Sequence, residues 1–382
     1  MSELIFDVSL DELRRRTSMK WRTFDADVLP AWVAEMDCRP APAVQQVIAE
    51  LMATGDTGYP AGSAGCADAF ADFAAWRWGW APSVNDTVVV PDVMQGVARS
   101  LELLTRPGDH VVINNPVYNC FYGFIPWAQR EILEVPLGAD HRLDLAALER
   151  AFSGAGGVKP TAYLLCNPHN PTGTLHTRAE LTAVAELAAR HEVAVVSDEI
   201  HAPLVTPADG FIPWLTIDPE GRSITVTSAS KAWNLAGLKA ALAIGTPLTG
   251  QLLRTLPDEV THAASYLGLV AHRAALTNGR DWLDRATAEL EANRARLHDR
   301  LEAELPMLTA VRGQATYLTW VDCSALGVPD PSAFLRTNGK VGFSTGSSYG
   351  SGGDQHVRIN FATSRAVLDE AIDRTVTAVA AR

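Results

Sequence analysis

The chain has 382 residues, of which 47% are hydrophobic and 20% charged, and its formal net charge at pH 7 is −12. The length suits one large α/β domain with a smaller companion, and the acidic balance argues against a general nucleic-acid binder or a protein of anionic membrane surfaces. The five cysteines form no CxxC pair, which favours reduced thiols in the cytoplasm and no zinc module. We find neither a signal-peptide pattern nor an uncharged apolar run of membrane-spanning length, and expect a soluble protein.

The N-terminal region, residues 1 to about 40, has little sustained periodicity, and Pro30–Asp37 reads as an extended arm. Prolines begin a predicted helix over residues 41–54, and Gly55 ends it. A second helix is predicted from about Ala64 to Trp78.

From Thr87 onward, strand and helix patterns alternate. The predicted strands are Thr87–Val90, His110–Ile113, Ile132–Val135, Thr161–Leu165, Val193–Ser197, Ser223–Thr227 and Ala240–Ile244. The predicted helices between them include Met94–Leu104, Asp144–Phe152 and Thr177–His191. This alternation predicts an α/β fold with a parallel, buried sheet between helices, in which ligands bind beyond the carboxyl ends of the strands.

Beyond about residue 246 the pattern changes to long helices with a few strands. A charged helix is predicted over Gly279–Glu304, strands around Val341 and Val357–Phe361, and a final helix from about Ala366 to Ala380. This part predicts a second, smaller α+β domain. We expect residues 1–45 to form an N-terminal arm and part of the small domain, 46–275 the large domain, and 276–382 the rest of the small domain.

A single lysine follows the predicted strand Ser223–Thr227, within the small, hydroxylated stretch Ser228-Ala229-Ser230-Lys231. Small residues let a backbone approach a ligand closely, and their hydroxyls and amides suit a phosphate. In a dry pocket, Lys231 can form an imine with an aldehyde. The alternative is an ordinary loop with a surface lysine.

Polar residues also follow neighbouring strands. Asn170 opens the second of two Asn-Pro steps that force a turn, and Asp198 is a carboxylate that needs a partner if it is buried. Arg358 is a charge inside an apolar strand. The competing interpretations are a plain turn, a helix N-cap and a structural salt bridge, respectively.

Together these residues suit pyridoxal phosphate. The lysine would form the imine, the hydroxyl-rich loop would hold the phosphate, and an aspartate facing the ring nitrogen would keep it protonated, so that the ring acts as an electron sink.

With these motifs in view, the chain resembles the fold-type I, class I/II aminotransferase-like enzymes. More narrowly it resembles the cystathionine β-lyase/C–S lyase branch (MalY/PatB type), whose opening is similar to Arg16–Trp21 and Leu29–Asp37, with Asp usual where Glu35 stands. The resemblance covers nearly the whole length. It implies a large domain with a mostly parallel sheet between helices and a smaller α+β domain.

The resemblance also implies roles for residues around the cofactor ring. Lys231 would carry the cofactor and move the substrate Cα proton, and Asp198 would face the pyridine nitrogen. Asn170 and His201 would bond the ring 3-oxygen, and Tyr118 would stack on the ring.

For the phosphate, the resemblance implies Ser228, Ser230 and the amides of Val93 and Met94. Tyr59 would reach the phosphate of a neighbouring subunit, which implies a homodimer. Lys239 stands where aminotransferases commonly have a phosphate-binding arginine. This departs from the pattern, although a lysine ammonium can also bind a phosphate. Asp92 stands where glycine is common, and an acid there is unfavourable unless its side chain points away.

For the substrate, the resemblance implies that Arg358 grips the α-carboxylate, with further contacts from Asn170, Tyr118 and Ala34. The reaction implied is β-elimination from cystathionine or another cysteine S-conjugate. The nearest alternative is a transaminase that uses the same residues. Two others are a penicillin-recognising serine enzyme, suggested by Ser-x-x-Lys but lacking Ser-Asp-Asn and Lys-Thr-Gly, and a non-catalytic pyridoxal-sensing regulator, for which no DNA-binding segment is visible.

Overall fold

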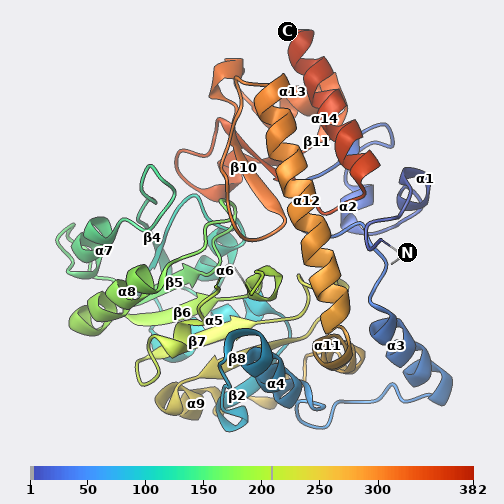
Figure 1. The fold of residues 1–382 in the computed structure, drawn as a ribbon. Coiled ribbons are helices and arrows are strands. Elements are labelled where there is room, and N and C mark those ends of the chain that lie inside the picture. Colours follow the sequence, from blue (N-terminus) through green and yellow to red (C-terminus); the bar gives the residue numbers. More distant parts are fainter. Residues whose placement is uncertain (1–3, 208–209) are drawn as a thin grey trace. The chain divides into compact units, whose positions relative to one another are not determined.

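The computed structural model describes residues 4–207 and 210–382, and these cluster into two compact units (Figure 1). The small unit comprises the chain up to Arg39, the short segment Asn170–Gly173 and Asp284–Arg382. The large unit comprises Pro40–His169 and Thr174–Leu283. The three-part division by residue number stays a prediction about folding domains.

The large unit is built on a seven-stranded sheet with the order β2-β8-β7-β6-β5-β3-β4. Its strands are β2 (Thr87–Val90), β3 (His110–Ile113), β4 (Glu131–Glu134), β5 (Ala162–Cys166), β6 (Ala194–Asp198), β7 (Ser223–Thr227) and β8 (Ala241–Gly245). All of the predicted strands form, each within one residue of its expected bounds, because short apolar runs bounded by turn residues are a strong strand signal.

The sheet is mostly parallel, as the fold class implied, but one strand is reversed. Strand β8 runs antiparallel to both of its neighbours, β2 and β7. The connection from β7 to β8 contains only the Lys231 loop and a short turn of 3₁₀-helix at Ala236–Leu238. A parallel pairing needs a crossover back to the opposite edge of the sheet, whereas this loop returns at the edge where β7 ends.

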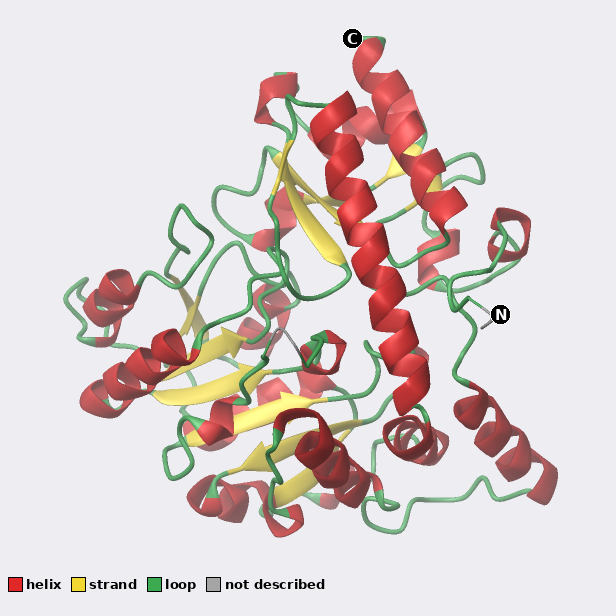
Figure 2. Ribbon diagram, in the orientation of Figure 1, coloured by secondary structure: helices red, strands yellow, loops and turns green. Residues whose placement is uncertain are grey.

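Helices cover both faces of this sheet (Figure 2). Neighbouring residues of β5 show the alternation, since Leu164 joins the core cluster with Val97 and Leu101 of one helix, while the Tyr163 ring meets the Phe152 ring at 5.7 Å. The helices of the large unit are α3 (Pro42–Thr54), α4 (Cys66–Trp78), α5 (Val93–Leu104), α6 (Phe121–Trp127), α7 (Leu145–Phe152), α8 (Arg178–His191), α9 (Pro247–Leu253), α10 (Asp258–Thr261) and α11 (Tyr266–Asn278).

Helix α5 lies unusually close to the sheet because of a glycine in its first turns. A Cβ at Gly96 would lie 2.7 Å from the Val226 side chain and 2.9 Å from the Val90 side chain. Only a residue without a side chain lets the start of α5 pack onto β2 and β7 at this distance. The glycine thereby fixes the N-terminus of α5 at the carboxyl edge of the sheet.

The small unit contains a four-stranded antiparallel sheet, ordered β12-β13-β10-β9, and a parallel pair, β1-β11. Its elements are α1 (Leu10–Leu13), α2 (Met19–Arg22), β1 (Leu29–Pro30), β9 (Thr309–Ala310), β10 (Leu318–Asp322), α13 (Pro331–Gly339), β11 (Val341–Gly342), β12 (Ser344–Thr345), β13 (His356–Asn360) and α14 (Arg365–Ala380). Strand β1 pairs Leu29 with Val341, so the N-terminal arm is part of this unit.

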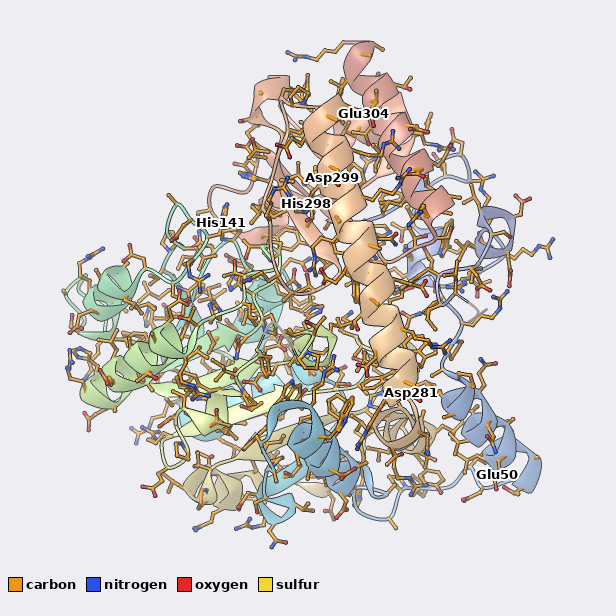
Figure 3. All side chains as sticks on the ribbon, viewed as in Figure 1. Glu50, His141, Asp281, His298, Asp299 and Glu304 are labelled. Carbon is orange, nitrogen blue, oxygen red and sulfur yellow. The ribbon has the colours of Figure 1, made fainter. Side chains whose placement is uncertain are left out.

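Helix α12 (Arg280–Glu304) is the long charged helix expected from the sequence, and most of its length belongs to the small unit. Figure 3 labels Asp281, His298, Asp299 and Glu304 along it. The buried His298 lies against β10, where its Nε2 is 2.9 Å from the Thr319 hydroxyl. No helix in the described ranges is both long and apolar enough to cross a membrane.

Candidate functional site

Polar side chains of the large unit gather at the carboxyl edge of its sheet. Asp198 is the last residue of β6 and pairs in register with Cys166 of β5 and Val226 of β7. The segment that carries Lys231 begins directly after β7 ends at Thr227. Because these parallel strands end side by side, the chain places an acid and a lysine at neighbouring positions.

Asp198 is a buried acid at this edge of the sheet. Its carboxyl is buried, accepts a hydrogen bond of 3.1 Å from the Ile200 amide, and lies within the field of the Lys231 charge. Burial raises the pKa of Asp198 to about 7, against the lowering effect of the amide and of Lys231. A cation held close to the carboxyl would therefore favour the ionised form of Asp198.

Two more residues that were predicted to contact the cofactor ring lie in the loops beside these strands. Tyr118 follows the end of β3, and its half-buried ring meets Phe121 edge-on at 5.8 Å. His201 is buried and caps the short 3₁₀-helix Ala202–Leu204. Both residues belong to the large unit, as Lys231 and Asp198 do.

The N-terminus of α5 offers backbone donors at the same edge. Asp92 is its N-cap, and Oδ1 of Asp92 accepts a hydrogen bond from the Gln95 amide at 2.9 Å. Capping therefore engages the third amide of the helix, while those of Val93 and Met94 come before it. First-turn amides have no partner within a helix and suit an anion.

The two departures from the family pattern turn out to neutralise each other. Nζ of Lys239 lies 2.9 Å from Oδ2 of Asp92, in a partly exposed ion pair. The acid that was expected to be unfavourable beside a phosphate is thus paired with the lysine that stands where the resemblance implies an arginine. Its other oxygen serves the helix cap, so Asp92 has a structural reason to be there.

The serines of the lysine loop bond within the protein. The buried Ser228 hydroxyl donates to the Ala240 carbonyl at 2.7 Å and accepts from the Ser230 amide at 3.1 Å. These bonds fix the turn before Lys231. A hydroxyl carries a single donor proton, so the Ser228 hydroxyl would have to rotate to donate to a phosphate. The Ser230 side chain is half-buried.

Arg358 lies in the small unit, on β13, and is 4% exposed. Nη1 donates to Oδ1 of Asn170 at 3.1 Å, and Nη2 donates to the Trp32 carbonyl at 2.9 Å. Its guanidinium carbon is 5.0 Å from the centre of the Tyr349 ring. The structure thus brings Arg358 and Asn170 together, although they are far apart in sequence.

The expected alternative for Arg358, a structural salt bridge, is absent from the described ranges. The oxygen atoms that bind its guanidinium belong to a side-chain amide and a backbone carbonyl, and its Nε is buried without a hydrogen-bond partner. A buried cation surrounded by neutral groups is costly unless an anion joins it. The side chain is therefore a ready site for a carboxylate.

Glu199 is a buried acid that the sequence analysis did not single out. One carboxyl oxygen accepts hydrogen bonds from the Trp214 amide at 2.7 Å and the Ser197 hydroxyl at 3.1 Å, and burial raises the pKa of Glu199 to about 8. It ties the chain after β6 to the segment around Trp214. The feature of the sequence that could have identified Glu199 is its position directly after Asp198.

Tyr59 and Ala34 are two further predicted residues, and they differ in exposure. Tyr59 is 96% exposed on the loop between α3 and α4, and Ala34 is buried in the small unit. His169, His176 and His272 are buried, which lowers the pKa of each. The described part of the chain has no group of three or more potential metal-ligating side chains.

The chain is similar to a large group of known proteins. The family model described as aminotransferase class I and II matches residues 31–374. A protein of Mycobacterium leprae (strain TN), named provisionally as a cystathionine beta-lyase, is 47% identical over 386 residues that cover 96% of each chain. Cystathionine beta-lyase PatB of Bacillus subtilis (strain 168) is 33% identical over 91% of this chain and 92% of its own.

Solved structures give the same result for the fold. The PLP-bound C-S lyase from Staphylococcus hominis superposes with a TM-score of 0.88, is 26% identical, and is matched over 96% of both chains. The resemblance inferred from the motifs, and the fold class that it implied, are confirmed.

Proposed function

We propose, from the premise that this chain belongs to the aminotransferase class I and II family, that it is a pyridoxal 5'-phosphate-dependent carbon–sulfur lyase. Its substrates would be L-cystathionine or related cysteine S-conjugates, and its products pyruvate, ammonia and a thiol. The reaction type is supported by the names of the relatives, which include a cystathionine beta-lyase 33% identical to this chain.

The observation that carries the proposal is the buried Asp198 carboxyl beside Lys231 at the ends of β6 and β7. Burial disfavours an unpaired charge on Asp198, so a cationic ring nitrogen held there would favour the ionised carboxylate and would in turn be stabilised by that carboxylate. Lys231 supplies the amine that an aldehyde requires. An acid and a lysine so placed fit pyridoxal phosphate.

The other donors fit the remaining parts of the cofactor. The amides of Val93 and Met94 at the start of α5 would hold the phosphate, with Lys239 and Ser230 as further donors. His201 and Asn170 would bond the ring oxygen, and Tyr118 would cover the ring. When bound, pyridoxal phosphate draws away the electrons left on Cα after its proton is removed.

Residues of this chain would bind the substrate and remove its Cα proton. Arg358 would hold the substrate α-carboxylate with two parallel N–H donors. Lys231 would remove the proton from Cα. The Cβ–S bond would break with its electron pair on the departing thiolate, and the remaining three-carbon fragment would hydrolyse to pyruvate and ammonia.

Incubation with L-cystathionine separates this proposal from its nearest alternative. The lyase is expected to release pyruvate and a thiol from L-cystathionine in the absence of any 2-oxo acid, because elimination needs no amino acceptor. A transaminase would turn over only when a 2-oxo acid is added. Strict dependence on the acceptor, measured by pyruvate and thiol assays side by side, would overturn the lyase assignment.

The Arg358 role makes a separate prediction. Arg358→Lys keeps the charge but loses the planar fork, so KM for the amino acid is expected to rise about tenfold or more, the equivalent of one charge-assisted bond of about 1.5–3 kcal/mol. Its effect on kcat is expected to be smaller. Steady-state kinetics on the loaded enzyme measure both constants.

Arg296→Lys is the matched control for that variant. Arg296 makes a bidentate ion pair with Asp369, at 2.6 and 2.8 Å, in the small unit that also contains Arg358. Its loss removes an equivalent fork without touching the proposed carboxylate site. An Arg358→Lys enzyme with the KM of Arg296→Lys would contradict the carboxylate role.

We also propose that the protein is a homodimer and is located in the cytoplasm. The side chain of Tyr59 is 96% exposed, and an active site shared with a second copy of the chain would cover it, which supports a homodimer. All five cysteines are free thiols in the structure, as expected in a reducing cytoplasm.

A further inference from the structure

The segment Ala31–Cys38 of the small unit is buried for much of its length but forms no regular secondary structure. Ala31, Ala34 and Met36 are among its buried residues. Backbone carbonyls in a buried segment need hydrogen-bond partners, and a segment outside helices and sheets must find them elsewhere. Here side chains from distant parts of the small unit provide them.

Strand β13 supplies the first of these donors. Residues two apart in a strand point to the same face, and Arg358 and Asn360 both reach this segment. Arg358 donates to the Trp32 carbonyl at 2.9 Å, and the Asn360 amide donates to the carbonyls of Val33 and Glu35, each at 2.7 Å.

Two more donors come from other elements. The hydroxyl of the fully buried Tyr317 donates to the Ala34 carbonyl at 3.0 Å. Nζ of Lys20 donates to the Glu35 carbonyl at 3.2 Å. Four consecutive carbonyls, Trp32 to Glu35, are thus each bound by a side chain.

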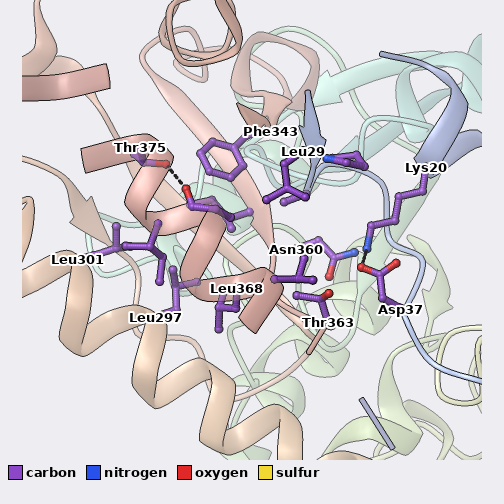
Figure 4. A pocket seen from close by; sticks show the side chains of 16 residues that line it. Lys20, Leu29, Asp37, Leu297, Leu301, Phe343, Asn360, Thr363, Leu368 and Thr375 are labelled. Carbon is purple, nitrogen blue, oxygen red and sulfur yellow. Dashed lines mark hydrogen bonds and ion pairs between the residues drawn. The ribbon is translucent and has the colours of Figure 1, made fainter. Parts of the chain in front are cut away.

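Lys20 is itself held in place by a buried acid. Nζ of Lys20 is 2.7 Å from Oδ2 of Asp37, and both side chains are only 1% exposed. The other Asp37 oxygen accepts from the Trp21 indole at 3.0 Å. Figure 4 shows the pair at one corner of a small cavity, with Asn360 close by. A buried ion pair contributes little net stability compared with apolar packing, so its use here suggests a need for fixed geometry.

We propose that Asn360, Tyr317 and Lys20 are positioning residues for substrate binding. They fix the backbone of residues 32–35, and the Trp32 carbonyl in turn fixes the Arg358 guanidinium. Every carbonyl of residues 32–35 is thereby engaged, and Ala34, which is predicted to contact the substrate carboxylate, lies within this fixed stretch. This inference rests on the proposed function, in which Arg358 and Ala34 bind the α-carboxylate.

Tyr317→Phe tests the inference with the loss of one hydroxyl. Backbone amides of residues 31–37 in the cofactor-loaded, substrate-free enzyme are expected to exchange with deuterium several-fold faster than in the wild type. KM for L-cystathionine is expected to rise about fivefold, the equivalent of one hydrogen bond, with kcat changed less. Asn360→Ala, which removes two of the bonds, is expected to show larger effects on both.

Thr375→Val is the control, because the buried Thr375 hydroxyl bonds only within its own helix, to the Ala371 carbonyl at 2.8 Å. It is expected to change neither exchange at residues 31–37 nor KM. Unchanged exchange in Tyr317→Phe, or faster exchange with unchanged KM, would overturn the positioning role. If the wild type proves to be a transaminase, KM is measured with an amino donor and an acceptor, so the two proposals fail separately.

Discussion

Replacing Lys231 by alanine is expected to abolish the visible absorbance of the cofactor-loaded protein and to lower turnover of L-cystathionine by at least about 10²–10⁴-fold. Positioned proton transfer alone contributes an effect of about this size, and the variant also loses the amine that holds the cofactor. Absorbance spectra and pyruvate release measure the two effects independently.

The other lysines make this prediction specific. The sequence holds five, of which Lys20, Lys239 and Lys340 form ion pairs with Asp37, Asp92 and Asp27. Lys159 is exposed, and Lys159→Ala is the control that should keep colour and activity. Borohydride reduction of the wild type followed by peptide mapping should label Lys231, and a label on another lysine would disprove the assignment.

Asp198→Asn is expected to have the second large effect. The amide keeps the size of the side chain but cannot carry the charge that stabilises a protonated ring nitrogen. We expect weaker cofactor binding and a fall in kcat of about 10²-fold or more, the size of a lost electrostatic contact in a buried site. Wild-type kcat in this variant would refute the role.

The same substitution has a readout that needs no cofactor. In the free protein, burial raises the pKa of Asp198 to about 7, above the value of about 3.9 expected in the unfolded chain. The folded state then binds more protons between these values, so the contribution of Asp198 to stability is present below about pH 4 and is lost as the pH rises through about 7. Asparagine does not titrate, so the variant should gain stability relative to the wild type between pH 5 and pH 8, measured by urea unfolding of the cofactor-free protein.

Glu199→Gln is the matched control for both readouts. Glu199 is the adjacent buried acid, and its pKa is raised by burial to about 8. This variant should show a similar pH effect on unfolding, with the same sign, but should keep the bound cofactor and its absorbance. Loss of the cofactor in Glu199→Gln as well would mean that the Asp198 result reflects local disorder rather than a missing charge.

Much of the fold and of the cofactor edge could be predicted because the signals are local. The strands of the large unit are short apolar runs bounded by turn residues, and their ends carry the small and polar residues that mark a ligand site. Lys231 and Asp198 were found this way, since a side chain just after a parallel strand must lie at the carboxyl edge, whereas Tyr118 was implied by the resemblance. The resemblance added their individual roles.

Other features depended on residues that are distant in sequence. The reversal of β8 depends on where the Lys231 loop returns, and nothing within β8 itself records its direction. The acceptability of Asp92 depends on Lys239, which is 147 residues away. Asn360 reads as an ordinary polar residue in an apolar strand until the carbonyls of Val33 and Glu35 are seen against it.

The sequence by itself therefore determined the order of helices and strands, the edge of the sheet where chemistry takes place, and the family. Periodicity, turn residues and short motifs are written in neighbouring residues, so they can be read without coordinates. Only the tertiary structure decided which groups neutralise or hold one another: Asp92 with Lys239, Arg358 with Asn170, and the carbonyls of residues 32–35 with their side-chain donors. Hydrogen bonds and ion pairs act over a few ångströms of space, and the chain brings such partners together from any separation in sequence.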